Sequence, residues 1–278
     1  MIPLTVELLL ALLTSLAFWA ATRRRSPLPI FGAGLRAMLL RPEYRRPLAL
    51  VVAIIILDII QSQLDGAITA ALGYDMTPWI HRLEGDSAAV FQRLEWPPAT
   101  WAFGFVYIVI LPALIAAPAV LAAAEDDLPA YRAGLRGFAW NYWIGLPFYF
   151  FFPVKEMWAG NPQHVRLLMD DLSPAIMEAY RANSAIDNCF PSLHTSLALT
   201  AALVASRVGP RSTARFLWPA AVAVVASTLY LGIHWASDVL AGCILAVIAS
   251  RLAVRGLSSP AEDYLSSSGS RVPPPAGA

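Results

Sequence analysis

The sequence predicts an all-α protein, a polytopic bundle of about seven transmembrane helices. Two observations lead to this expectation. The chain is 58% hydrophobic and only 14% charged, which is unlike an ordinary soluble domain. Its apolar residues also fall into long runs, each close to the roughly 20 residues that a helix needs to cross a bilayer. The predicted crossings lie near 2–22, 47–69, 100–124, 134–154, 191–207, 213–232 and 237–254.

The first predicted crossing is interpreted as an uncleaved helix. In a secretory signal the positive charges precede the apolar run, whereas here Arg23, Arg24 and Arg25 follow it. Residues 1–255 are expected to form a single transmembrane domain. The tail 256–278 is rich in Ser and Pro and has no apolar period, which indicates disorder.

The basic residues predict the orientation of the bundle. Fifteen of the 20 Lys and Arg residues fall in alternate loops or after the last crossing. Cytoplasmic loops collect such residues, so the N-terminus is predicted outside and the C-terminus inside. The strong preference for Arg over Lys indicates a GC-rich, prokaryotic genome, and hence a prokaryotic plasma membrane. The opposite loops hold the other five basic residues, which are Arg82, Arg93, Lys155, Arg166 and Arg181.

Two outer loops, 70–99 and 155–190, are long. The first resembles an amphipathic segment, so we expect an interfacial helix on the outer face. Long ordered loops are usually functional, and both are expected to cap a reaction site.

Two motifs place ionisable groups beside apolar segments, where such groups are costly and usually functional. The first reads Asn-Cys-Phe-Pro-Ser-Leu-His-Thr-Ser over 188–196, and the second reads Tyr-Leu-Gly-Ile-His-Trp-Ala-Ser-Asp-Val-Leu-Ala-Gly over 230–242. The predicted topology brings His194, His234 and Asp238 to the outer membrane face. We therefore expect these three side chains to converge.

This set of residues suits phosphoester chemistry. Such a reaction needs a nucleophile for phosphorus and an acid for the departing alkoxide, and two histidines in different protonation states can divide these tasks. A carboxylate one helical turn from an imidazole fixes its tautomer. Pro191 and Ser192 suit a helix start, whose amides attract phosphate, and Thr195 adds a second hydroxyl donor beside Ser192.

The paired motifs resemble two of the three signature motifs of the type 2 phosphatidic acid phosphatase superfamily, integral membrane enzymes that cleave or exchange phosphoester bonds of lipids. The resemblance implies that His234 attacks phosphorus to form a phosphohistidine, that Asp238 supports it and that His194 is the general acid. It also implies that Ser192 contacts the phosphate. The function implied is a metal-independent lipid phosphate phosphatase or phosphotransferase with an extracytoplasmic active site, no cofactor and no nucleic-acid partner. The resemblance is strong over 188–242 and weak over 141–187.

The chain departs from the phosphatase pattern in two places. Thr228 occupies the position of an arginine that grips phosphate, and the first motif, a Lys followed by Arg-Pro, is not matched. These departures resemble the branch of inositol phosphorylceramide synthase and sphingomyelin synthase, which implies transfer of a headgroup to a polyol or lipid alcohol. The candidates to offset phosphate charge are Lys155, Arg166 and Arg181.

Other polar residues have two interpretations. Asp58, Gln61 and Asp65 form a stripe at helical spacing, either for hydrogen bonds between helices or for a proton or headgroup contact. His81 and His164 are interpreted as interfacial residues without a catalytic role. Cys189 and Cys243 fall in different settings, so no disulfide is expected.

Two other functions remain open. A metal-dependent hydrolase could bind zinc through His194, His234 and Asp238, although the chain has no His-Glu-x-x-His motif and no Cys cluster. A lipid transporter or scramblase is compatible with an acidic residue near the membrane midplane. Transporters are often built from two repeated halves, and no repeat is visible here.

Overall fold

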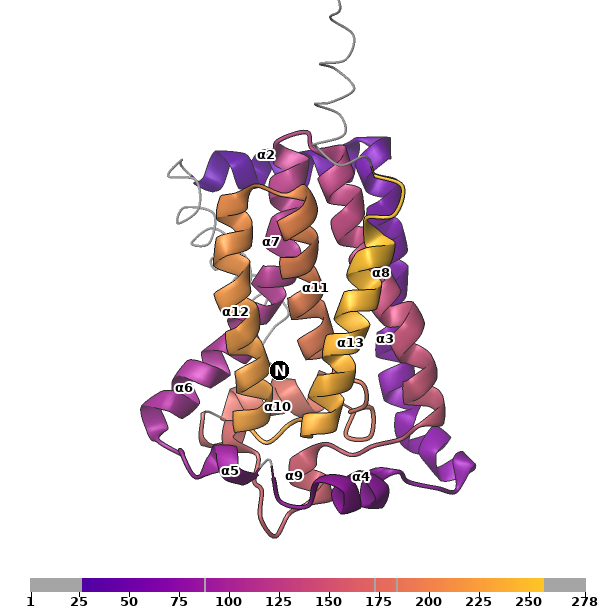
Figure 1. Cartoon of the computed structure of the whole chain (residues 1–278). Helices are drawn as coiled ribbons and strands as arrows, with labels where there is room; N and C mark the ends of the chain where they lie inside the picture. Colours follow the sequence, from indigo (N-terminus) through magenta and orange to yellow (C-terminus); the bar gives the residue numbers. More distant parts are fainter. Residues whose placement is uncertain (1–26, 88, 173, 184, 258–278) are drawn as a thin grey trace, which may run out of the picture.

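A computed structural model describes residues 27–87, 89–172, 174–183 and 185–257. Over these residues the chain is helical and contains no strand, apart from one isolated bridge between Val154 and Asn188. Long helices pack side by side, and short helices lie across both ends of the bundle (Figure 1). The elements are α2 (Pro27–Leu40), α3 (Pro42–Leu72), α4 (Thr77–Glu84), α5 (Ala89–Gln92), α6 (Pro97–Phe105), the π-helical η1 (Val106–Ile110), α7 (Leu111–Ala124), α8 (Leu128–Phe151), α9 (Met157–Gly160), the 3₁₀-helical η2 (Leu168–Asp171), α10 (Pro174–Asn183), α11 (Leu193–Val208), α12 (Arg211–Tyr230) and α13 (Ala236–Ala253).

Four helical segments are long and apolar enough to cross a membrane: Pro42–Leu72, Pro97–Ala124, Arg211–Tyr230 and Ala236–Ala253. They correspond to four predicted crossings, and they confirm a helical fold compatible with a membrane protein. Seven crossings are not established. The predicted crossing at 2–22 and most of the predicted tail lie outside the described residues. Two other predicted crossings correspond to α8 and α11, which are not among these four segments. Helix α11 has 16 residues, about 24 Å at 1.5 Å per residue, and α8 carries arginines in its first turns.

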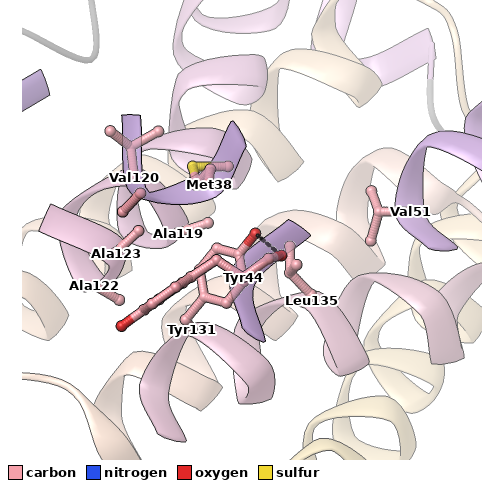
Figure 2. Close-up of a cluster of buried hydrophobic side chains, with 10 residues drawn as sticks. Met38, Tyr44, Val51, Ala119, Val120, Ala122, Ala123, Tyr131 and Leu135 are labelled. Atoms are coloured by element: carbon pink, nitrogen blue, oxygen red, sulfur yellow. Dashed lines mark hydrogen bonds between the residues drawn. The ribbon is translucent and has the colours of Figure 1, made fainter. Parts of the chain in front are cut away.

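The segment between the first two predicted crossings, 23–46, was treated only as a loop, but it contains a helix that was not predicted. Helix α2 occupies much of this segment, and α3 begins at Pro42, before the predicted start at 47. The reason is an apolar face on α2: Ala37 and Met38 are buried against α7. Figure 2 shows Met38 beside Val120 in this cluster. The arginines of the segment obscured that face in the sequence.

Helix α11 lies at the centre of the bundle and packs against α7, α8, α12 and α13. Small residues allow this close approach: Ala198 and Ala202 are fully buried. Asn141 of α8 donates a hydrogen bond to Thr200 of α11 at 3.0 Å, the kind of polar contact that fastens helices in an apolar medium. The position of the first turn of α11 is therefore fixed on several sides.

The two ends of the bundle differ in charge. The end that carries α2 also holds the beginnings of α8 and α12 and the ends of α11 and α13 (Figure 1), so Arg41, Arg136 and Arg211 lie there. The opposite end holds the beginnings of α11 and α13. Helices α4, α5, α9 and α10, from the two long loops, lie at this second end. Residues 70–99 thus contain short helices, although their relation to a membrane surface is not established.

Candidate active site

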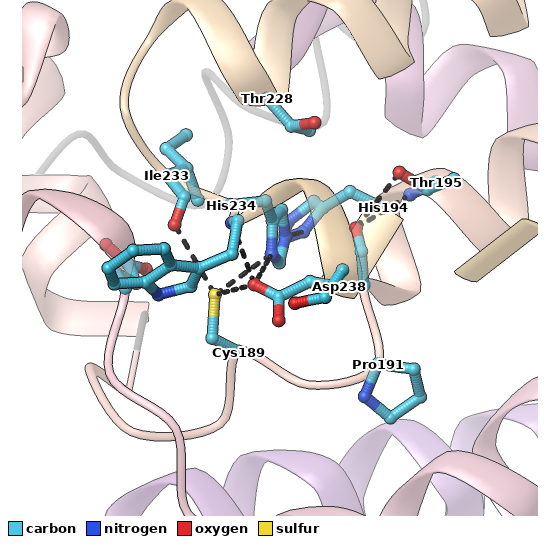
Figure 3. Close-up of polar contacts among 12 residues, drawn as sticks. Cys189, Pro191, His194, Thr195, Thr228, Ile233, His234 and Asp238 are labelled. Atoms are coloured by element: carbon cyan, nitrogen blue, oxygen red, sulfur yellow. Dashed lines mark hydrogen bonds and ion pairs between the residues drawn. The ribbon is translucent and has the colours of Figure 1, made fainter. Parts of the chain in front are cut away.

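His194, His234 and Asp238, which were expected to converge, lie together at the end of the bundle that carries the long loops (Figure 3). His194 is in the first turn of α11, His234 is in the turn between α12 and α13, and Asp238 is in the first turn of α13. Nδ1 of His194 is 3.0 Å from Nε2 of His234. On the other side of that ring, Nδ1 of His234 is 3.4 Å from Oδ2 of Asp238. The three groups form a continuous line.

The cap of α11 fixes His194. Ser192 is the N-cap residue, and its Oγ accepts a hydrogen bond from the amide of Thr195 at 3.2 Å, as the sequence indicated. The Ser192 hydroxyl also donates to Oγ1 of Thr195 at 3.1 Å. A Cβ atom at Gly242 would lie 2.6 Å from the Ser192 carbonyl oxygen, so α13 supports this turn closely. Ser192 and Thr195 adjoin the histidines, but their hydroxyls are used within the cap.

The turn that carries His234 depends on Thr228. The amides of Ile233 and His234 both donate to the carbonyl oxygen of Thr228, at 3.0 and 3.2 Å. Gly232 adopts a φ of 81°, and a Cβ there would lie 2.6 Å from the carbonyl oxygen of Arg166. Glycine alone takes this conformation without strain. Thr228, at the position of the superfamily arginine, therefore has a backbone role in holding His234.

Cys189 belongs to the site, and the sequence analysis missed this role. Its Sγ is 3.0 Å from Nδ1 of His234 and 3.0 Å from Oδ2 of Asp238. Burial, and next the nearby charge of Asp238, raise the pKa of this thiol well above its ordinary value, so the thiol keeps its proton. The available signal was its place in the first motif, five residues before His194. Both Cys189 and Cys243 are free.

Burial sets the protonation of His234. The side chain is 4% exposed, and burial lowers the pKa of the imidazole to about 3. The His234 ring is therefore neutral near pH 7, the form in which a ring nitrogen carries a free lone pair. Burial, and next the neighbouring His234, lower the pKa of His194 to about 3 as well, so His194 is also neutral until it receives a proton. Oδ2 of Asp238 also accepts from the Trp235 amide at 2.9 Å, while Oδ1 is buried without a hydrogen-bond partner among the described residues.

One cluster has the residue types that bind metals. Donor atoms of Cys189, His234 and Asp238 all lie within 4.8 Å of one another. This group differs from the zinc ligands considered from the sequence, because Cys189 takes the place of His194. The thiol, the imidazole and the carboxylate are already joined to one another by hydrogen bonds. Nε2 of His234 faces His194 instead of this cluster.

The candidate phosphate-binding cations are paired with carboxylates. Nζ of Lys155 is 3.0 Å from Asp75, Arg166 binds Asp171 at 2.7 Å and also Glu95, and Arg181 binds Asp170 at 3.0 Å. All these side chains are partly exposed. The backbone of Lys155 does reach the site, since its carbonyl oxygen accepts a hydrogen bond from Trp235 Nε1 at 2.9 Å. The structure thus leaves the three cations around the site, each with an acidic partner.

The polar stripe on α3 makes contacts both between elements and within the helix. Asp58 interacts with Tyr142 of α8, and Gln61 binds Asp65 within α3. One turn beyond the stripe, Thr69 binds Asp187 at 2.5 Å. These contacts favour the packing interpretation of the stripe. The two loop histidines, His81 and His164, both lie near Asp86, at 3.7 and 3.3 Å.

Residues 141–259 match the family model of the PAP2 superfamily. The match confirms the resemblance at the level of the superfamily for this part of the chain, and it includes both motifs. It does not test the branch. No curated protein and no solved structure matches the chain.

Proposed function

We propose that the protein is a membrane-embedded hydrolase or transferase acting on lipid phosphoesters through a phosphohistidine intermediate. One observation carries the proposal: the neutral, buried imidazole of His234 points its Nε2 at a second histidine 3.0 Å away, with a carboxylate behind it. The match of 141–259 to the PAP2 superfamily supports the same chemistry.

The geometry suggests a division of roles. The two ring nitrogens separate to admit the phosphoryl group, and Nε2 of His234 attacks phosphorus. The bond from phosphorus to the leaving oxygen breaks, and Nδ1–H of protonated His194 donates its proton to that oxygen. Asp238 accepts the Nδ1–H of His234 and stabilises the positive ring that forms. Water or an alcohol then attacks phosphorus, gives its proton to His194 and releases His234.

Three further features support a lipid substrate at the extracytoplasmic face. The helices that build the site include segments apolar enough to span a bilayer. The site lies at the end of the bundle opposite the arginine-rich end, and arginines favour the cytoplasmic side. The beginning of α11 adjoins His194, and the amides and dipole of a helix start attract phosphate. The charge of the bound phosphate would be balanced by Lys155 or Arg166 after release from their carboxylates.

The acceptor is either water or a hydroxyl compound. Thr228 in place of the superfamily arginine favours the headgroup-transfer alternative, as in inositol phosphorylceramide synthase. Phosphatase activity is the broader proposal.

The test uses the purified full chain in detergent micelles with a panel of lipid phosphates, with and without inositol or lipid alcohols. Products are identified by mass. We expect phosphate release or headgroup exchange by the wild type and none by His234→Ala, with radioactive phosphate from the substrate recovered on His234. Full activity of His234→Ala would refute the proposal. Absence of any turnover by the wild type would favour the transporter or scramblase, since no gradient exists in micelles.

A second candidate is a metal-dependent hydrolase, favoured by the grouping of Cys189, His234 and Asp238. It predicts that a chelator abolishes activity and that zinc restores it. The phosphohistidine proposal predicts no effect of a chelator.

A further inference from the structure

A chain of hydrogen bonds begins at His194, on the side of its ring that faces away from His234. The hydroxyl of Tyr107 is 2.8 Å from Nε2 of His194, and the two rings are tilted by 33° with centroids 4.8 Å apart. The other ring nitrogen, Nδ1, faces His234. His194 is therefore held between a phenol and an imidazole, and each ring nitrogen has one partner.

Tyr107 reaches this position from an irregular turn. It lies in the π-helical segment η1, which interrupts the helical span Pro97–Ala124. Such π-turns are rare and frequently occur at functional sites. Tyr107 is only 8% exposed, so its hydroxyl needs partners inside the protein.

The chain continues to a buried carboxyl group. The ring of Tyr107 lies edge-on to that of Tyr180 of α10, with centroids 6.2 Å apart, which brings the two hydroxyls within reach of each other. The Tyr180 hydroxyl donates to Oε1 of Glu156 at 2.6 Å. Glu156 is 5% exposed, and Nε1 of Trp158 donates to its other oxygen. Two hydroxyls thus connect a carboxyl group to the ring proposed as the general acid.

We propose that Glu156, Tyr180 and Tyr107 form a proton relay that charges His194, an inference that rests on the proposed function. When Glu156 takes up a proton, the Tyr180 hydroxyl turns from Glu156 towards Tyr107. Glu156 then gives its proton to the Tyr180 oxygen as Tyr180 gives its own to Tyr107. Tyr107 then gives its proton to Nε2 of His194. Each hydroxyl ends with one proton, Glu156 becomes a carboxylate, and His194 becomes an imidazolium. Glu156 regains a proton from water.

The relay meets a requirement of the proposed mechanism. His194 must be charged before each attack on phosphorus while its neighbour His234, 3.0 Å away, stays neutral. The relay restores this charge whenever the proton returned by the acceptor is lost before the next substrate binds. A proton delivered at Nε2 enters on the side away from His234 and leaves Nδ1–H directed towards the substrate. The other titratable groups that act on Tyr107 are Glu156 and Cys189, and Cys189 lies on the His234 side of the site.

The test compares leaving groups. An alkyl lipid phosphate such as phosphatidic acid needs protonation of its leaving oxygen, whereas an aryl phosphate such as p-nitrophenyl phosphate does not. General acid catalysis contributes about 10²–10⁴-fold. We expect Tyr107→Phe, Tyr180→Phe and Glu156→Gln each to lower kcat on phosphatidic acid by about 10- to 100-fold, with less than a threefold loss on the aryl substrate. The solvent isotope effect on kcat for phosphatidic acid should change as well.

Tyr131→Phe is the matched control, because the Tyr131 hydroxyl is also buried and donates to a carbonyl oxygen, that of Tyr44, at the other end of the bundle. It should leave both activities unchanged. Equal losses on the two substrates, or no loss in the relay variants, would overturn the relay. If the relay alone is wrong, His234→Ala is still inactive on both substrates. An active His234→Ala, or an inactive wild type, would refute the proposed function and the relay with it.

Discussion

Two kinds of polar contact occur at the same end of the bundle, and they differ in exposure. The side chains of His234 and Asp238 are 4% and 0% exposed. The ion pairs in the surrounding loops are much more exposed to solvent: the side chains of Lys155 and Asp75 are 46% and 30% exposed. Electrostatic interactions are strong where water is excluded and are screened where it is not. The buried groups therefore suit chemistry that needs fixed protonation states, and the loop pairs suit exchange of a carboxylate for a substrate phosphate.

The largest effect is expected from a substitution in the buried group. Asp238→Asn keeps an oxygen for the Trp235 amide but loses the charge that supports His234, so we expect kcat to fall by about 10²–10⁴-fold while the protein remains folded. Asp171→Asn makes the same chemical change in an exposed pair and should lower kcat by less than threefold. Measurement of kcat and thermal melting for both variants checks this. Similar losses of kcat in the two variants would show that the buried and the exposed contacts do not differ in their importance for the reaction.

The next effect concerns the packing behind the buried group. Gly242→Ala would place a methyl group 2.6 Å from the Ser192 carbonyl oxygen, which we expect to lower the free energy of unfolding by about 1–3 kcal/mol. Gly66→Ala is the matched control, since a Cβ there meets nothing within 4 Å. Alanine favours helix, so this control should be neutral or slightly stabilising. Thermal melting in detergent distinguishes the two, and equal melting temperatures would contradict the expectation.

A smaller effect is expected if a loop lysine exchanges its carboxylate partner for the substrate phosphate. If Lys155 leaves Asp75 to bind the substrate phosphate, Lys155→Ala should raise KM by about tenfold, the lower end of the 1.5–3 kcal/mol of a charge-assisted hydrogen bond. Asp75→Asn should lower KM, because the lysine is then free of its acidic partner. Steady-state kinetics measures both. An unchanged KM for Lys155→Ala would remove it from the phosphate-binding groups.

The smallest effect is a pH dependence that burial should suppress. The nucleophile must be neutral, and burial lowers the pKa of His234 to about 3, so the neutral form persists as the pH falls through 6.5. After correction for ionisation of the substrate, kcat/KM should lose less than twofold between pH 7.5 and 5.5 through His234. An ordinary histidine, with a pKa near 6.5, would lose about tenfold. A loss of that size would mean that His234 is open to water when substrate is absent.

The sequence predicted what local pattern and motif spacing determine. The positions of four long apolar helices, the cap at Ser192 and the meeting of His194 with His234 agree with the structure. It did not predict α2, because the arginines within and around this segment were given more weight than its apolar face. It also did not predict the contacts of Tyr107 or Cys189. Tyr107 lies in an apolar run, where hydropathy does not distinguish a buried hydroxyl, and the role of Cys189 depends on a turn 45 residues away.

Glu84 has a consequence for any attempt to shorten the protein. Its carboxylate accepts hydrogen bonds from the amides of Ala236 and Ser237, at 2.8 and 2.6 Å, and so caps the helix that carries Asp238. Glu84 and Tyr107 both precede residue 141, where the family match begins. A truncated gene encoding 141–259 would therefore yield a fragment that lacks the cap and one partner of His194. The part of this molecule that matches the family model therefore does not hold the complete site by itself.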